Sequence, residues 1–208
     1  MTIGNRFFSN KLLNDFEERL QDSNSLSALR SMMDNSLSNL GFAAYAYVRI
    51  AVQPNGAWEI GGLTNYPRDW CKHYRDADYF TVDPTLWYCE SACRPVPWHE
   101  LNERQRRMDI GHDLFEEARL FGLSNGITVP LHGGDGWLSA MNVVTDLACR
   151  EADRLVTAHM ETVHIMSILF HGIAEERIRS SKLQFPRSRQ AGKPIYGYRA
   201  PGVTRRIQ

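Results

Sequence analysis

Residues 40–52 read LGFAAYAYVRIAV, and the spacing of apolar residues changes within this stretch. Just before it, over residues 26–39, leucine and methionine recur every three or four positions, which predicts a helix that Ser25 can cap. From Tyr45 to Ile50 the aromatic and β-branched residues predict a strand instead. PNG follows as a turn signal, and AWEIGGL then reads as the hairpin partner. A helix that leads into an antiparallel hairpin indicates a mixed α/β domain.

The elements on either side support the same fold class. A second hairpin is predicted from GITVPLH and WLSAMNVVTD, which the turn GGDG joins. The order of elements predicts an antiparallel sheet of about five strands with helices on both faces. In chain order, the other predicted elements are a helix over 11–20, a helix that begins at Pro67, a helix near 85–92, the extended PVPW at 95–98, a helix over 102–121 capped by Gly122, and a long helix over 150–178.

Composition limits the class of protein. Of the 208 residues, 43% are hydrophobic and 11% aromatic, which is enough for a packed core. No apolar run reaches the roughly 18–20 residues of a membrane helix, and the N-terminus lacks the apolar region of a signal peptide. We therefore expect a cytoplasmic protein whose cysteines are reduced thiols. Neither a Cys-x-x-Cys pair nor a His-Glu-x-x-His motif is present, so we expect no metal site and no cofactor.

Charge divides the chain into two parts. Residues 179–208 hold eight basic residues and no acidic one, which leaves 16 basic and 24 acidic residues in 1–178, a net charge of −8. The basic segment also contains Pro186, Pro194 and Pro201, and its apolar residues have almost no periodicity. We expect 1–178 to be a ligand-binding domain and 179–208 to be a disordered basic tail.

The common nucleotide-binding motifs are missing. The sequence has no Walker loop and no Gly-x-Gly-x-x-Gly. We therefore expect a binding protein and assign no catalytic residue.

Residues 65–84, NYPRDWCKHYRDADYFTVDP, hold the candidate site. Trp70 and Tyr74 are four positions apart and share a helix face with an apolar body and polar tips. With Tyr66 and Asp83 they could line a pocket that buries an apolar tail and hydrogen-bonds an amide or ester head. By spacing alone, such aromatic residues are more often core, and an aspartate before proline is more often a turn or cap residue than a ligand contact.

Several separated motifs resemble one family. They are similar to the autoinducer-binding domain of LuxR-type quorum-sensing transcriptional regulators, the TraR- and LasR-like group. The matching motifs are YAYVRI, NYPRDW, Tyr74, VDP, PVPW and FGLSNGITVPLHGGDGWLSAM. The resemblance covers roughly residues 10–175. It implies an α/β/α sandwich that buries an N-acyl-homoserine lactone between the sheet and one helical layer.

The resemblance also implies roles for single residues. Trp70 would donate to the lactone carbonyl, Tyr66 would donate to the amide carbonyl, and Asp83 would accept from the amide N–H. Trp98 would pack on the lactone ring, and Tyr74 would line the acyl side. Further positions that match the pocket or the sheet beside it are Thr85, Thr128, Asn142 and Gly126.

Three departures affect ligand preference. Asn142 stands where relatives commonly have serine or threonine, and it can both donate and accept, which leaves the preferred 3-substituent open. Cys71 replaces an arginine of this group, and Val48 occupies a position that is glycine in part of it. The acyl chain length is likewise open.

The family continues into a helix-turn-helix, which the proline-containing segment 179–208 cannot form. We therefore expect a protein that binds the signal and acts as an antiactivator, by dimerising through the helix over 150–178 with a full-length LuxR-type regulator. Specific DNA binding and membrane association are not expected. The alternatives are a homodimer that buffers the signal, a conventional LuxR-type transcription factor, and an inert truncated product.

Overall fold

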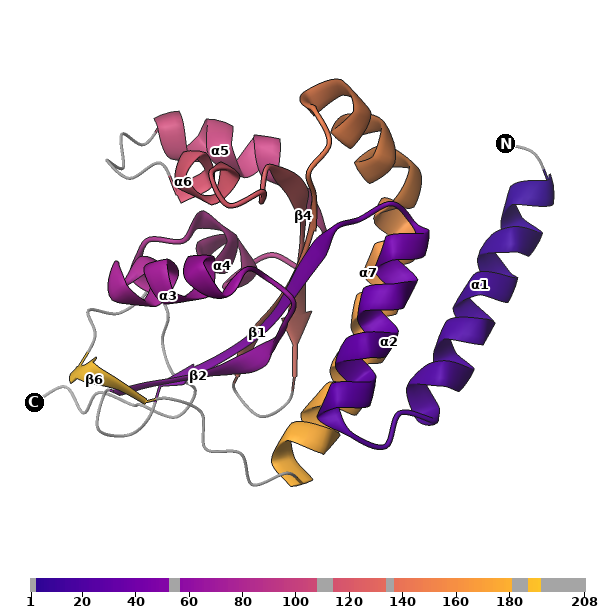
Figure 1. Ribbon diagram of the computed structural model, residues 1–208, viewed down its shortest axis with the longest axis horizontal. Helices are drawn as coiled ribbons and strands as arrows, with labels where there is room; N and C mark the ends of the chain where they lie inside the picture. Colours follow the sequence, from indigo (N-terminus) through magenta and orange to yellow (C-terminus); the bar gives the residue numbers. More distant parts are fainter. Residues whose placement is uncertain (1–2, 53–56, 108–113, 134–136, 181–186, 192–208) are drawn as a thin grey trace, which may run out of the picture.

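The computed structural model describes residues 3–52, 57–107, 114–133, 137–180 and 187–191. Helices cover both faces of one antiparallel sheet, which makes an α/β/α sandwich (Figure 1). The helices are α1 (Ile3–Gln21), α2 (Leu26–Asn39), α3 (Arg68–Asp76), the short 3-10 helix η1 (Tyr79–Thr81), α4 (Pro84–Cys89), α5 (Trp98–Arg107), α6 (Leu114–Arg119) and α7 (Cys149–Ser180). The strands are β1 (Ala44–Val52), β2 (Ala57–Thr64), β3 (Val96–Pro97), β4 (Asn125–His132), β5 (Leu138–Thr145) and β6 (Arg187–Ala191).

Two hairpins lie side by side in the sheet. β1 pairs with β2 and β4 with β5, and β5 also pairs with β1, so the strand order is β3-β4-β5-β1-β2-β6. Near one end of this sheet, Asn142 of β5, Ala46 of β1 and Thr64 of β2 are paired in one row. This row becomes important for the site, because the chain leaves β2 two residues before Tyr66.

The face toward α1, α2 and α7 carries the main core. Tyr45 and Tyr47 of β1 point to this side, and both rings contact Phe170 of α7 edge-on. Arg49 follows on the same side, and its guanidinium is paired with Glu175 of α7 at 3.0 Å. Because side chains alternate along a strand, the intervening Ala46, Val48 and Ile50 are left for the opposite face.

The opposite face, toward α3, α4, α5 and α6, is packed in two smaller clusters. Trp70, Trp98 and Phe115 belong to the first cluster, and Ile50, Phe80 and Leu86 belong to the second. Tyr74 packs against both clusters. Residues of both clusters line a cavity on this face of the sheet.

The predicted fold class is confirmed. Both hairpins form, and α2 begins after Ser25, whose hydroxyl oxygen accepts from the backbone N–H of Ala28 at 3.1 Å. Pro67 is the N-cap of α3 rather than its first residue. Leu123 and Gly122 donate their backbone N–H groups to carbonyls of the last turn of α6, and Gly122 has the positive φ of a glycine cap, 80°.

The single helix expected over 102–121 is wrong. α5 begins at Trp98, directly after the strand residue Pro97, and α6 is a separate helix from Leu114. Both helices bury apolar residues against the same cluster. The spacing of apolar residues therefore does not show where α5 ends and α6 begins. Residues 108–113 lie outside the described residues, as does the predicted PNG turn at 54–56 and most of GGDG.

Part of the segment expected to be disordered forms a strand. β6 pairs antiparallel with β2 at the edge of the sheet, with Ala57 opposite Ala191. The backbone groups along the outer edge of β2 thereby gain partners from the chain itself. In the described part of the chain no helix is both long and apolar enough to cross a bilayer.

Candidate functional site

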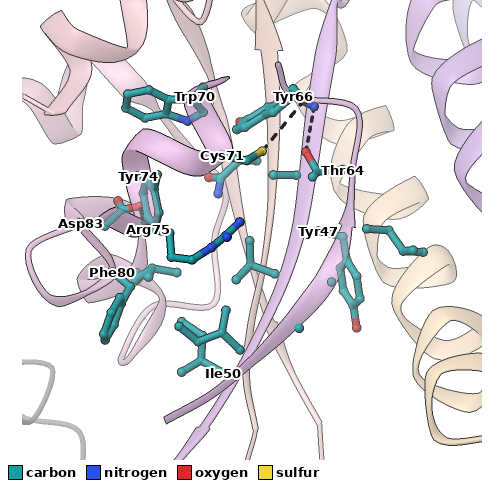
Figure 2. Close-up of a pocket in the computed structure, with 18 of the residues that line it drawn as sticks. Tyr47, Ile50, Thr64, Tyr66, Trp70, Cys71, Tyr74, Arg75, Phe80 and Asp83 are labelled. Carbon is teal, nitrogen blue, oxygen red and sulfur yellow. Dashed lines mark hydrogen bonds between the residues drawn. The ribbon is translucent and has the colours of Figure 1, made fainter. Parts of the chain in front are cut away.

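A cavity of about 620 Å³ lies between the sheet and the α3–α4 layer. Its walls are β1, β2, α3, η1 and α4, with one residue of β5 and the loop residues Tyr66 and Asp78. Figure 2 shows side chains around it. The volume is within the range of about 300–1,000 Å³ that small-molecule sites occupy. Tyr47 points away from the cavity, toward α7 (Figure 2), and its hydroxyl is 2.8 Å from Nδ1 of His171.

Tyr66 and Trp70 form a polar region of the cavity wall. The buried hydroxyl of Tyr66 has no hydrogen-bond partner in the described residues. Burial, with the nearby charge of Asp83, raises the pKa of Tyr66 well above its ordinary value, so the phenol keeps its proton and can donate. A buried unpartnered donor such as this hydroxyl costs about 1–3 kcal/mol unless a ligand satisfies it. Trp70, in the first turn of α3, is buried and lines the same cavity, where its indole N–H is a second donor.

Asp83 supplies the acceptor. It is the N-cap of α4, and Oδ1 accepts from the backbone N–H of Thr85 at 2.7 Å. Tyr74 donates its hydroxyl to Oδ2, also at 2.7 Å. Burial raises the pKa of Asp83, and these hydrogen bonds act in the opposite direction. Because a carboxylate oxygen accepts more than one hydrogen bond, Asp83 is held by two donors and still has capacity for a ligand N–H.

A third polar group enters the cavity from β5. Trp98 donates its indole N–H to Oγ1 of Thr128 at 3.0 Å, and Thr128 donates its hydroxyl to Oδ1 of Asn142 at 2.7 Å. Asn142 lines the cavity, whereas Thr128 and Trp98 stand behind it. Gly126 allows this packing: a Cβ there would lie 2.6 Å from the carbonyl oxygen of Val143 and 3.2 Å from the Trp98 ring.

The rest of the wall is mainly apolar. The apolar residues that line the cavity here are Val48, Ile50, Ile60, Phe80 and Leu86. Strand β2 comes close at Gly62, where a Cβ would be only 1.9 Å from the carbonyl oxygen of Tyr47. The cavity therefore suits a molecule with a polar head and an apolar tail.

Trp70 is held in place by rings from three elements. His73, Tyr79 and Phe121 all contact its indole, with ring centroids 5.4–6.1 Å apart. Glu117 of α6 joins these supports, because its Oε2 is 2.6 Å from Nε2 of His73 and also accepts the Tyr79 hydroxyl. We call His73, Tyr79 and Glu117 the α3–α6 clasp.

Five of the eight site residues predicted from sequence line the cavity together: Tyr66, Trp70, Tyr74, Asp83 and Asn142. Thr85, Trp98 and Thr128 lie one layer behind, where they orient Asp83 and Asn142. Sequence reasoning missed Arg75, whose side chain reaches across the cavity in Figure 2. Its spacing of four from Cys71, beside the Trp70–Tyr74 pair, was an available signal.

Comparisons agree with this class of site. Residues 25–173 match the family model described as the autoinducer binding domain. The transcriptional activator protein TraR of Rhizobium radiobacter is 26% identical over 130 residues, which are 62% of this chain and 53% of that protein. The quorum sensing-dependent regulator RpaR of Rhodopseudomonas palustris is 27% identical over 144 residues, 69% of this chain and 57% of that protein. The chain thus spans about half the length of these curated relatives.

A solved structure shows the same fold. CepR2 of Burkholderia cenocepacia, described as an N-acylhomoserine lactone dependent LuxR family transcription factor, superposes with a TM-score of 0.69 at 23% identity. The match covers 82% of this chain and 96% of that one. Fold and cavity define a small-molecule-binding α/β/α domain. Since the family model matches most of its length, the chain belongs to the autoinducer-binding domain family of LuxR-type regulators, whose members in these comparisons are regulators and not enzymes.

Proposed function

We propose that the cavity binds an N-acyl-homoserine lactone. The observation that carries the proposal is the buried, unpartnered hydroxyl of Tyr66 beside the indole of Trp70, with Asp83 as acceptor in the same cavity. An acyl-homoserine lactone has two carbonyls that accept and one amide N–H that donates, and these match the two donors and the acceptor. Its acyl tail matches the apolar walls.

A panel of acyl-homoserine lactones tests this proposal through thermal unfolding. A ligand that binds only the native state stabilises it by about 2.7 kcal/mol at a hundredfold excess over Kd. We expect a rise in Tm that depends on chain length and is weakened in Asp83→Asn and Trp70→Phe. Folded protein that no lactone stabilises would contradict the proposal.

Dimerisation would use α7. One face of this helix is exposed at positions that alternate in spacing between three and four residues. These positions are Ala158, Glu161, Ile165, Ile168 and Gly172. This is the spacing along the contact seam of paired helices. The exposed isoleucines, with 43% and 51% of their surface accessible, are the apolar residues that a second helix would cover.

The proposed cellular role is that of an antiactivator. In a mixed dimer with a full-length regulator of this family, a subunit that contributes no helix-turn-helix leaves one DNA reader where a two-fold operator needs two. The test is co-expression with such a regulator and a reporter gene. We expect inhibition that persists with signal in excess. Inhibition that excess signal abolishes would identify a buffer instead, and failure to co-purify would exclude the mixed dimer.

A further inference from the structure

Asn142 has a fixed orientation that the amino-acid type alone does not determine. The indole N–H of Trp98 can only donate, so Oγ1 of Thr128 is its acceptor. The hydroxyl proton of Thr128 then needs an acceptor of its own, and Oδ1 of Asn142 lies 2.7 Å away. If the amide were turned over, its N–H groups would face that hydroxyl, and the proton of Thr128 would have no acceptor among the described residues.

Burial makes this orientation firm. Thr128 is fully buried and Asn142 is 6% exposed, so water does not substitute for a lost partner, and an unmade bond costs about 1–3 kcal/mol. The carbonyl oxygen of Asn142 is thereby held toward Thr128. Its amide nitrogen, which has no partner in the described part of the chain, is left for the cavity. The nitrogen, with two hydrogens to donate, is therefore the part of the Asn142 amide that has no partner, whereas Oδ1 already accepts from Thr128.

The sheet register places Asn142 in the same row as the start of the segment that carries Tyr66. Asn142, Ala46 and Thr64 are paired in this row, and the backbone N–H of Tyr66 donates to Oγ1 of Thr64 at 2.9 Å. Asn142 and Tyr66 both line the cavity. Tyr66, Trp70 and Asn142 together present four donor hydrogens.

An unsubstituted acyl-homoserine lactone does not use all four. Its lactone carbonyl can serve Trp70, and its amide carbonyl can accept from Tyr66 and from one hydrogen of Asn142. The second hydrogen of Asn142 would stay unpaired in a buried site. Two hydrogens on one nitrogen reach two oxygens only when these lie close together, and the oxygens of a 1,3-dicarbonyl do.

We infer that Asn142 makes this site selective for 3-oxoacyl-homoserine lactones, in which a keto oxygen follows the amide carbonyl along the chain. The inference rests on the proposed function. A 3-hydroxyl is a poorer match, because it can accept from the Asn142 nitrogen but brings a proton of its own that this nitrogen cannot accept.

Isothermal titration with three lactones of equal chain length, carrying a 3-oxo, a 3-hydroxy or no substituent, tests the inference. We expect the 3-oxo ligand to bind about tenfold more tightly than either of the others. Asn142→Ala should reduce this preference to about onefold while the unsubstituted lactone still binds. Thr128→Val keeps the shape but removes the hydroxyl that orients Asn142, so the 3-hydroxy ligand should gain on the 3-oxo ligand.

The outcomes separate the inference from the function on which it rests. Binding of all three lactones with equal affinity, or a preference for the hydroxyl, would overturn the inference and leave the proposed function intact. A 3-oxo preference that survives both substitutions would assign the selectivity elsewhere and also overturn it. Folded wild-type protein that binds none of the lactones would overturn the proposed function itself. The melting temperature of each unliganded variant shows that it is folded.

Discussion

Tyr74 has a structural role in addition to the one that the family resemblance implies. The resemblance implies that it lines the acyl side of the pocket, and in the structure it also donates its hydroxyl to Asp83 at 2.7 Å. Tyr74→Phe should therefore destabilise the unliganded protein by about 1–3 kcal/mol, because a buried carboxylate loses a donor. Urea unfolding measures the change. Tyr88→Phe is the matched control, since its hydroxyl donates to a carbonyl at an exposed site. Equal effects of the two substitutions would show that the bond to Asp83 has no special weight.

The free energy of unfolding should depend on pH because of Glu90. Burial raises its pKa from 4.5 to about 7. Between these values the native state holds a proton that the unfolded state has released, so the free energy of unfolding should fall as pH rises from about 4.5 to 7. Glu90→Gln should remove this contribution. The measurement is the difference between wild type and variant in unfolding free energy across pH 4.5–8, and a difference that does not change with pH would contradict the prediction.

At the scale of single residues, the sequence identifies the type of each side chain but not the direction in which it points in the folded protein. Tyr66, Trp70 and Asp83 could be placed in a pocket from the sequence only through a family resemblance, because their spacing fits a core equally well. The orientation of Asn142 could not be predicted at all. It depends on Thr128 and Trp98, which are 14 and 44 positions away and meet it only in the folded sheet.

Among the elements, α6 acts on the site through the α3–α6 clasp. Glu117→Gln removes the charge that accepts from His73 and Tyr79, and these rings support the indole of Trp70. Because the Glu117 side chain is 39% exposed, we expect a loss of at most about 1 kcal/mol in stability, together with weaker lactone binding. Glu116→Gln on the same helix is the control: its ion pairs with Arg106 and Arg119 are as exposed and involve none of the rings around Trp70, so lactone affinity should not change. Unchanged lactone affinity in Glu117→Gln would show that the clasp does not position Trp70.

Elements with a clear local signal were predictable, and those without one were not. The period change at residues 40–52 and the cap at Ser25 locate the first hairpin and α2 closely. β6 has no such signal, because its residues are mostly polar and its pairing depends on the edge of β2. For the same reason, the apolar spacing over 102–121 predicts one helix where the structure has α5 and α6.

For the whole molecule, the proposed dimer requires an exposed apolar surface. Most of the apolar surface is buried between the layers, and the large apolar side chains that stay exposed among the described residues are Leu120, Leu147, Ile165 and Ile168. Only the last two lie within a helix, on the face of α7 that also presents Ala158 and Gly172. The small residues allow close approach of a second helix, and the isoleucines supply apolar contact.

Charges on this face should therefore separate the subunits without changing the cavity. Ile165→Glu with Ile168→Glu places two carboxylates in the proposed seam, where a second copy would present the same charges by symmetry. We expect a monomer by sedimentation velocity, with lactone affinity close to that of wild type, because α7 lies on the opposite face of the sheet from the cavity (Figure 1). Leu120→Glu is the control: its side chain is 83% exposed after α6, and the substitution should leave the dimer intact. A dimer that survives the double substitution, or is lost with Leu120→Glu, would place the interface elsewhere.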